Sequence, residues 1–399
     1  MPTPTSPTGS DPDHPAGTVL ARLVGDPDRF AREHWARAPL YRPGTDPAAF
    51  ADLFSLGDVD HILSLTTPRF PAFRMVKDGR QLDPRSYTRS GRVGGKPVDD
   101  LADPGGVYEL FHGGATIVLQ SLHRFWPPLV RLGRDLELAL THPVQVNAYI
   151  TPPASRGLGV HHDEHDVFVL QVHGRKRWDV HDPDGRPEER LIEAELEPGD
   201  CLYIPQRFPH AAWTAQTASV HLTVGVVPVT WADMLRRAVG SAVEGALSGE
   251  PLPVGFAADP AALTAGVAEQ LGEVRRRLDK LDPAAIAVAA ADRFWSGRPP
   301  ILAGQLQQLL SLQEIGDDTL VRRRPGAVCR LRQRAGRLEV LLGDRALHMP
   351  PRLAPVMEAI LASDRLAVTD LSGHLDPPSR LVLVRRLIRE GLLETVARS

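Results

Sequence analysis

The chain has 399 residues, 42% hydrophobic and 24% charged, which is a globular composition and too much sequence for one ordinary core, so two to four domains are expected. The formal charge of -3 argues against a general nucleic-acid binder, and two cysteines are too few for a disulfide scaffold or a cysteine-rich zinc site. No apolar stretch approaches the roughly 18 residues of a membrane span and the N-terminus lacks a secretory signal pattern, so we expect a cytoplasmic protein with no membrane partner.

Residues 1–17 are rich in Pro, Ser, Thr, Gly and Asp and have no apolar period, which predicts a disordered tail. From residue 18 the apolar positions recur three and four apart, which predicts N-terminal helices. Between about 110 and 228 the pattern changes to short β-branched and aromatic runs such as ATIVLQ, VQVNAYIT and VFVLQV. Many short strands at close spacing indicate a sandwich or barrel, so residues 18–228 are interpreted as one domain with its β core in 110–228.

Helical periodicity returns after residue 228. Two amphipathic segments in 229–300 have apolar faces that need a partner, and a second copy of the chain could supply it, so a helical dimerisation region is predicted. Residues 301–399 show the order helix, strand, strand, helix, helix, helix, strand, which suggests a winged-helix module. This part has 15 Arg against 11 Asp and Glu, a mild excess that gives weak support for DNA binding.

A histidine and an aspartate stand two residues apart just before the run VFVLQV, at His161 and Asp163. Residues i and i+2 of a strand face the same side, so both side chains can point into a barrel and hold one ion. The segment GDCLYIPQRFPH supplies a third ligand, His210. Two imidazoles and one carboxylate on one face of an octahedron leave three positions open, as in non-haem Fe(II) oxygenases. The motifs therefore predict an Fe(II) site in a double-stranded β-helix, or cupin-type, core.

A chance origin of the first motif has to be weighed, because the chain contains 15 histidines. The second motif makes chance less plausible, since Gly199 and Pro205 stand where a cupin pattern places its turn and strand end, although Arg207 stands where that pattern prefers glycine. Other histidines nearby are expected to be exposed or hydrogen-bonded rather than ligands: His162, His165, His173 and His181. Only His165 is kept as a candidate at the pocket mouth.

An iron site that activates dioxygen needs two electrons from a co-reactant, and the sequence has no flavin, haem or nicotinamide fingerprint. A 2-oxo acid can supply them by chelating the iron through its keto oxygen and C1 carboxylate. Its distal carboxylate then requires a buried cation, for which a compact ammonium is suited. Lys176, one of only four lysines, begins the strand KRWDV that pairs with VFVLQV through a short turn. A solvated lysine at a strand end remains the alternative.

The segments NAYITPPASRGLGVHHDEHDVFVLQVHGRKRWDVH and PGDCLYIPQRFPH, and more loosely FAREHWARAPLYRP, resemble the Jumonji-C oxygenases. Within them the chain is most similar to the ribosomal oxygenases, which hydroxylate ribosomal proteins. The resemblance implies an α+β chain with a cupin-type catalytic core, a helical dimerisation region and a C-terminal winged helix that is generally not taken to bind DNA. It also implies that His161, Asp163 and His210 bind the iron and that Lys176 binds the distal carboxylate of 2-oxoglutarate.

The same resemblance places Asn147 and Tyr149, in NAYITPP, at positions that line the cosubstrate and substrate pocket. His221 stands where some members carry an asparagine on the last core strand. We therefore expect Asn147 and His221 to join Lys176 in binding 2-oxoglutarate, and Tyr149 and His165 to line the substrate pocket.

The expected reaction is the hydroxylation of a protein or peptide side chain by O2, with conversion of 2-oxoglutarate to succinate, in a homodimer. A ribosomal protein is the leading substrate through the resemblance alone, and a natural-product precursor peptide is the competitor. A histone-type demethylase is disfavoured because the barrel region shows too few clustered aromatics for a methyl-ammonium cage. A cupin enzyme that works without 2-oxoglutarate is disfavoured by Asp163 together with Lys176.

An alternative of a different class is a transcription regulator in which the barrel senses a ligand and the winged helix binds DNA. Its signature would be a basic recognition helix, and the segment RLVLVRRLIREGLL offers four arginines: Arg380, Arg385, Arg386 and Arg389. These arginines lie on more than one face of the expected helix, so the sequence does not decide the point.

Overall fold

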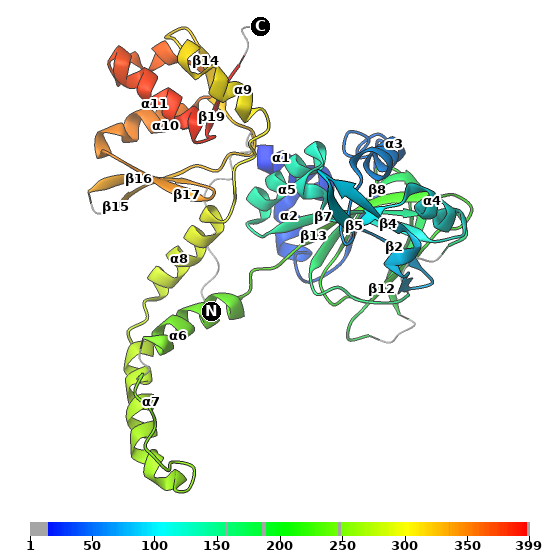
Figure 1. Cartoon of the computed structure of the whole chain (residues 1–399), viewed down its shortest axis with the longest axis horizontal. Coiled ribbons are helices and arrows are strands. Elements are labelled where there is room, and N and C mark those ends of the chain that lie inside the picture. Colours follow the sequence, from blue (N-terminus) through cyan, green and yellow to red (C-terminus); the bar gives the residue numbers. More distant parts are fainter. Residues whose placement is uncertain (1–14, 156–158, 186–188, 246–248, 335, 397–399) are drawn as a thin grey trace. The chain divides into compact units, whose positions relative to one another are not determined.

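The computed structural model describes residues 15–155, 159–185, 189–245, 249–334 and 336–396, and most of the expected disordered tail lies outside these residues. Helix α1 (Pro15–Val24) begins slightly before residue 18, where helical periodicity is expected. The chain divides after Pro228 into two compact units, residues 1–228 and 229–399 (Figure 1). Each unit has its own hydrophobic core.

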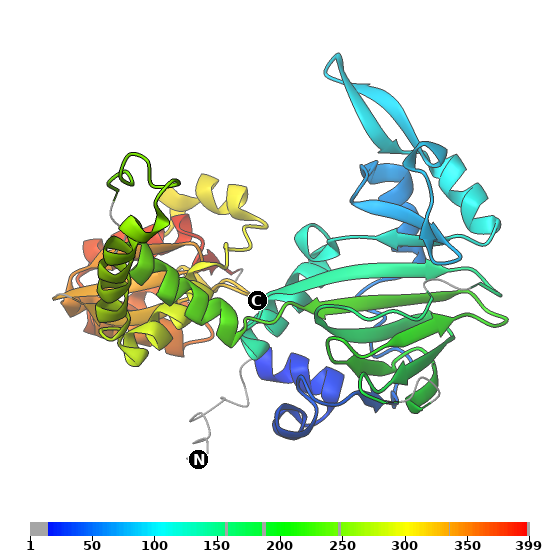
Figure 2. The same ribbon diagram turned by 90° about the horizontal axis from the view of Figure 1, so that it is seen from below.

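The first unit is built on two antiparallel β-sheets that face one another (Figure 2). The large sheet has the order β1-β11-β8-β13-β7-β6-β2-β3 and the small sheet the order β10-β9-β12. Three strands of the large sheet, β1 to β3, precede residue 110 and so lie outside the expected core. The large sheet comprises β1 (Leu40–Arg42), β2 (Phe73–Lys77), β3 (Arg80–Gln81), β6 (Thr116–Leu119), β7 (Val144–Thr151), β8 (Asp166–Gly174), β11 (Cys201–Ile204) and β13 (Ser219–Val226). The small sheet comprises β9 (Lys176–His181), β10 (Arg190–Leu196) and β12 (His210–Trp213).

Alternation along β7 separates the hydrophobic core of this unit from a polar interior. Val146, Ala148 and Ile150 are buried in the main core, where they meet leucines of α1 and of α5 (Pro127–Leu140). Side chains of successive strand residues point to opposite faces, so Tyr149 and Thr151 face the small sheet instead. The space between the two sheets is closed at one side by a smaller apolar cluster from β8, β9, β10 and β11. The polar residues of β7 therefore border an enclosed space.

Further elements surround the large sheet. Helices α2 (Pro27–Glu33), α3 (Leu56–His61) and α4 (Pro104–His112) add to the main core through Phe30, Val59 and Val107. A separate hairpin, β4 (Thr88–Val93) with β5 (Lys96–Ala102), projects from the rest of the unit in Figure 2. The first unit is thus a sheet-based core with helices on one side, as the strand and helix patterns predict.

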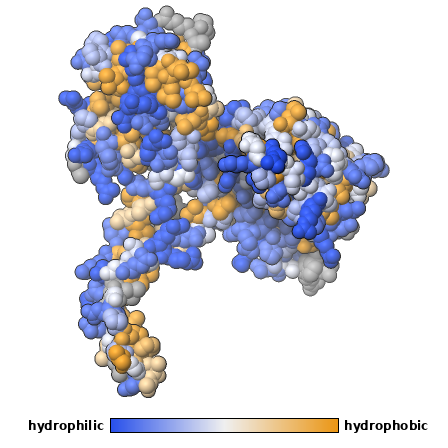
Figure 3. Space-filling model, viewed as in Figure 1, coloured by the Kyte–Doolittle hydropathy of each residue, from blue (hydrophilic) through white to orange (hydrophobic). Residues whose placement is uncertain are grey.

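The second unit begins with three helices, α6 (Trp231–Glu244), α7 (Thr264–Leu278) and α8 (Pro283–Ser296). Among their described residues none is fully buried, and the apolar side chains of Trp231, Leu235 and Leu271 are largely exposed. Apolar side chains are visible on the surface of this helical segment in Figure 3. Helix α6 starts with a capping box in which Thr230 and Asp233 satisfy each other's backbone N–H groups.

The rest of the second unit packs helices against short sheets. Its core joins α10 (Ala354–Ala362) and α11 (Pro377–Arg389) through Met357, Ile360, Val384 and Leu387. The order differs from the expected one because the short strands β14, β17 and β18 are added and one expected helix is a 3-10 segment, Val368–Gly373. Besides α9 (Gln305–Leu310), the remaining elements are a sheet of β18 (Leu366–Ala367), β14 (Leu320–Arg323) and β19 (Leu393–Thr395), and a sheet of β15 (Arg330–Arg334), β16 (Arg337–Leu342) and β17 (Arg345–Met349).

Candidate metal centre and active-site cavity

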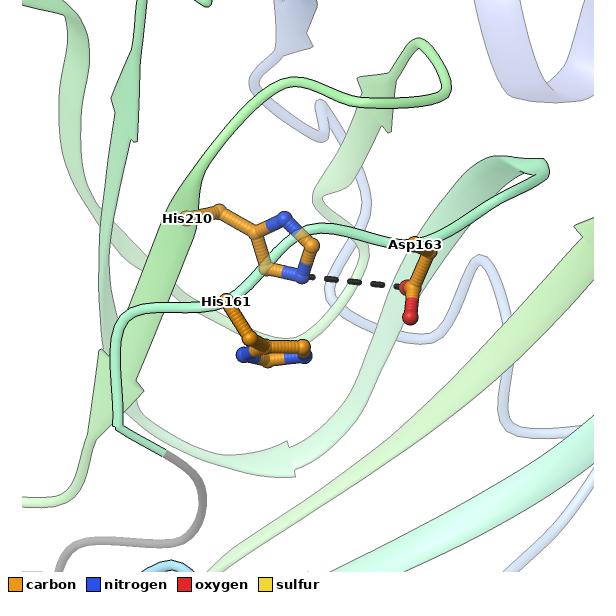
Figure 4. A group of neighbouring side chains, drawn as sticks. All are labelled: His161, Asp163 and His210. Atoms are coloured by element: carbon orange, nitrogen blue, oxygen red, sulfur yellow. Dashed lines mark ion pairs between the residues drawn. The ribbon is translucent and has the colours of Figure 1, made fainter.

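Three potential metal ligands converge between the two sheets of the first unit. One ligand atom from each of His161, Asp163 and His210 lies within 4.8 Å of the others, and the three side chains point toward one another in Figure 4. The Nε2 atom of His210 is 3.8 Å from an oxygen of Asp163. In the described part of the chain this is the one cluster of three such groups, and no fourth protein ligand joins it. The geometry fits the expected open site for a divalent ion.

Backbone pairing brings the two histidines together. His161 and His210 form an isolated antiparallel bridge, with N–H···O distances of 3.1 and 2.8 Å in the two directions. Contrary to expectation, His161 and Asp163 do not share a strand: they lie ahead of β8, and only His161 is in a β-bridge. The carbonyl of Asp163 instead accepts a hydrogen bond from the N–H of Arg207 at 2.8 Å. His161 and Asp163 are thus fixed by separate backbone hydrogen bonds, one to His210 and one to Arg207.

Arg207 adopts left-handed backbone geometry with φ of 67°. This conformation explains why the cupin pattern prefers glycine here, since a residue with a Cβ atom is strained in it. In this strained conformation the N–H of Arg207 donates a hydrogen bond to the carbonyl of Asp163, one of the three metal ligands.

Both imidazoles are held in the form that binds metals. The Nδ1 atom of His161 lies 2.9 Å from the carbonyl oxygen of Gly159, and that of His210 lies 3.0 Å from that of Phe208. A carbonyl can only accept, so each Nδ1 carries the proton and each Nε2 keeps its lone pair for an ion. Burial, above all, lowers the pKa of His210 and favours its neutral form.

A cavity of about 140 Å³ joins the three ligands to Lys176. The Lys176 side chain is only 4% exposed, its Nζ atom donates to Oγ1 of Thr151 at 3.0 Å, and it lies 5.9 Å from the Trp178 ring centroid. Burial lowers the pKa of Lys176 to about 7. No acidic side chain of the described residues pairs with it, and an ammonium buried without a counter-ion is costly. The cavity therefore offers a place for an anionic ligand, and Lys176 is not a solvated lysine.

Cross-strand pairing lines up another set of cavity residues. Arg74 of β2 pairs with Val118 of β6, Val118 with Tyr149 of β7, and Tyr149 with His221 of β13. Directly paired residues share a face of the sheet, and all four line the cavity. A β-bulge in the pairing of β13 with β8 falls at Val220 and His221, a position where bulges commonly re-aim a side chain.

His221 is buried in an aromatic wall. Its ring stacks on Tyr149 at 5.1 Å between centroids and meets the Trp178 ring edge-on at 5.3 Å. Burial, and then the charge of Lys176, hold the pKa of His221 well below its usual value, so the ring is neutral. Its Nδ1 atom has no hydrogen-bond partner among the described residues. An unpaired buried polar atom of this kind is available to a ligand.

Two expected site residues do not line the cavity. The side-chain oxygen of Asn147 accepts from the N–H of Ser121 at 2.9 Å and so fixes a turn after β6. His165 lies with its Nε2 3.3 Å from the Gln145 amide nitrogen and packs on Gly225, where an added Cβ would come within 2.6 Å of the imidazole. Their assignments to 2-oxoglutarate and substrate stay predictions.

Several cavity residues have no motif that marks them in the sequence: Arg74, Thr116, Trp178 and Thr223. Thr151 could have been found, because it alternates with Tyr149 along a single expected strand. The others depend on which strands pair and in what register, which the sequence does not state.

The family model described as "JmjC domain" matches residues 123–234. This segment is similar to JmjC domains. The matched residues include all three candidate metal ligands and Lys176, which lie within its bounds. The match confirms the expected resemblance over the part of the chain that supplies most of the cavity residues.

Curated proteins similar to this chain are named as an oxygenase and as a demethylase and hydroxylase. Ribosomal oxygenase 1 of Gallus gallus is 33% identical over 239 residues, covering 55% of this chain and 38% of that protein. The bifunctional lysine-specific demethylase and histidyl-hydroxylase NO66 of Culex quinquefasciatus is 29% identical over 226 residues, covering 52% of this chain and 34% of that protein. The matching part of this chain thus spans little more than a third of these relatives.

Solved structures of Escherichia coli ribosomal oxygenase YcfD share the fold. One aligns with a TM-score of 0.55 at 19% identity, covering 94% of this chain and 99% of that protein, and another was solved with cobalt and 2-oxoglutarate. This likeness, with the JmjC domain match, confirms the expected cupin-type core with mixed helices and sheets. None of the described helices is long and apolar enough to cross a membrane.

The His161→Ala variant should bind Mn(II), a redox-silent divalent ion, at least about a hundredfold more weakly than wild type, because one of three ligands is lost. Isothermal titration of the metal-free protein measures this. The matched control is His162→Ala, since the His162 side chain is exposed and its ion pair is with Glu164, which is itself exposed. Equal Mn(II) affinities for the two variants would contradict the assigned ligand set.

Proposed function

We propose that this chain is an Fe(II)- and 2-oxoglutarate-dependent hydroxylase that acts on a side chain of a ribosomal protein. The observation that carries the proposal is one cavity that joins an open site of two histidines and an aspartate to the buried ammonium of Lys176, for which the described residues offer no acidic partner. The names of the relatives, and the YcfD structure with cobalt and 2-oxoglutarate, support the cofactor pair and the substrate class. The cytoplasm, where ribosomal proteins are made, is the proposed location.

The donor set fits the proposed cofactors. When bound, Fe(II) and 2-oxoglutarate supply dioxygen activation: one oxygen atom enters a C–H bond as a hydroxyl, and the other enters succinate as CO2 is released. His161, Asp163 and His210 would hold the ion through two Nε2 atoms and a carboxylate. Lys176, oriented by Thr151, would neutralise the distal carboxylate. The rings of Trp178, Tyr149 and His221 would exclude water from the reacting centre.

The contacts of α11 give little support to the alternative of a DNA-binding regulator. Arg380 pairs with Asp317 at 2.6 Å, Arg386 pairs with Glu390 at 2.7 Å, and Arg385 donates to backbone carbonyls including that of Ile315. Three of the four arginines of the expected recognition helix are therefore used within the unit, which leaves few to contact phosphates. A natural-product precursor peptide could use the same cavity, and only the substrate separates that alternative from a ribosomal protein.

We also propose that residues 301–399 form a winged-helix domain and that 229–300 mediates homodimerisation. The stacking of α10, the 3-10 segment and α11 against β18, β14 and β19 supports the first. Exposed apolar residues spaced four apart on α6, Trp231, Leu235 and Val239, support the second, because they form one unpartnered stripe.

Protein supplied with Fe(II), ascorbate, O2 and 2-oxoglutarate should form succinate and add one oxygen to a ribosomal protein. Intact-mass analysis of ribosomal proteins from cells with and without the gene identifies the target, and the purified target then serves as the assay substrate. His161→Ala should abolish both products, whereas His162→Ala should retain them. Undiminished succinate formation by His161→Ala would defeat the proposal.

Binding of 2-oxoglutarate should weaken as pH rises above about 7. The carboxylate needs the ammonium form, and the pKa of Lys176 without ligand is lowered to about 7, so binding at higher pH must take up a proton. Affinity should be nearly level below pH 7 and fall up to about tenfold per unit above it. Calorimetric titration of the Mn(II)-loaded protein between pH 6 and 9 measures this. Lys176→Arg should remove the slope, and a level profile for wild type would be inconsistent with the role of Lys176.

The full-length protein should have twice the mass of the 43.5 kDa chain in light scattering, and Trp231→Glu with Leu235→Glu should reduce it to the monomer. A charge on the apolar stripe would be buried without a partner in the dimer. The control is Arg237→Glu, at an exposed polar position of the same helix. A monomeric wild type would refute the dimerisation proposal.

A further inference from the structure

A second cation, Arg74, lines the cavity besides Lys176. Its Nε atom donates to Oε1 of Gln120 at 3.2 Å, and its side chain lines the same cavity as Tyr149. The hydrogen bond to Gln120, which directly follows β6, orients the planar guanidinium at the cavity wall. Arg74 is therefore a fixed charge of the cavity and not a mobile surface group.

Arg74 and Lys176 lie at different levels of the cavity. Lys176 contacts Thr151, whereas Arg74 lies in the cross-strand row of Tyr149, which is two residues earlier on the same face of β7. Two residues of a strand span about 7 Å, so one small ligand carboxylate does not engage both cations through these neighbours. Arg74, Tyr149 and Asp163 line the same cavity, and burial, with a further contribution from the charge of Asp163, raises the pKa of the Tyr149 phenol. The row of Arg74 and Tyr149 is therefore the one near the metal ligands.

When the cavity holds Fe(II) and 2-oxoglutarate, as the proposed function requires, no negative charge of the cavity remains to balance Arg74. Asp163 is the one carboxylate among the residues that line the cavity in the described structure. The two charges of the ion and the charge of Lys176 balance that carboxylate and the two carboxylates of 2-oxoglutarate. The positive charge of Arg74 is then left over, next to the place where a target side chain must approach the ion.

We propose that Arg74 sets the charge class of the target residue. It admits a side chain that carries no positive charge and accepts a hydrogen bond, such as an imidazole, a carboxamide or a carboxylate. It repels the ammonium of lysine, with or without methyl groups, and the guanidinium of arginine. Two like charges about 6 Å apart in a partly buried site correspond to discrimination on the order of a hundredfold.

The test uses two probes of nearly the same shape that differ in charge, neutral acetamide and the acetamidinium ion. Full-length protein loaded with Mn(II) and 2-oxoglutarate is mixed with each, and the paramagnetic broadening of the probe's methyl NMR signal reports its approach to the ion. In wild type, acetamide should be broadened at least tenfold more than acetamidinium. Arg74→Gln should bring the ratio close to one, whereas Arg74→Lys, which keeps the charge, should preserve it.

A matched control is Arg89→Gln, which removes an exposed arginine of the β4–β5 hairpin and should leave the ratio unchanged. Broadening by acetamidinium equal to that by acetamide in wild type, or no broadening by either probe, would overturn the proposal. So would an Arg74→Gln variant with the wild-type ratio. Calorimetric binding of 2-oxoglutarate is measured on the same samples, so loss of that binding identifies a failure of the proposed function rather than of the charge filter.

The same conclusion can be checked on a reaction product. Once a protein target is found by mass, the oxygen should map to a residue without positive charge. Mapping to an arginine or lysine, with 2-oxoglutarate consumed, would reject the charge filter and leave the hydroxylase intact.

Discussion

The metal centre depends on two backbone hydrogen bonds between His161 and His210, residues that are far apart in the sequence. These bonds place the two imidazole centroids 4.4 Å apart, close enough for both Nε2 atoms to reach one ion. Burial above all, and the neighbouring His161 ring to a smaller degree, lower the pKa of His210. The pairing that assembles the site thus also favours the neutral, metal-binding form of His210.

The large sheet extends this local arrangement into a cavity. Strand alternation sends one set of β7 side chains into the main core and the other set, including Tyr149 and Thr151, toward the small sheet. Packing on one face therefore fixes the positions of polar groups on the other. The same strands that bury the leucines of α5 hold the hydroxyl that orients Lys176.

The sequence sufficed for those parts of the site that are written in consecutive residues. The spacing of His161 and Asp163, the position of His210 and the scarcity of lysine predict four residues that the structure brings to one cavity. The motif did not reveal that Asp163 lies in a loop, because the bond from Arg207 that fixes it comes from a distant segment.

Arg74 could not be predicted because its place depends on long-range pairing. Arg74 reaches the cavity because β2 pairs with β6 and β6 pairs with β7, and the sequences of such short strands do not specify this pairing order. Similarly, Asn147 stands in the motif that resembles the family, yet its amide oxygen is engaged by the N–H of Ser121. In the second unit, β14 was overlooked because Val321 is the one residue of this short, arginine-rich strand that is fully buried.

The left-handed backbone at Arg207 limits which amino acids can replace the arginine during evolution, although the loop faces solvent. Glycine, asparagine and aspartate adopt this geometry most readily, whereas β-branched residues would add strain to the segment that fixes Asp163. Replaceability at this surface position is therefore governed by main-chain torsion and not by the chemistry of the arginine side chain.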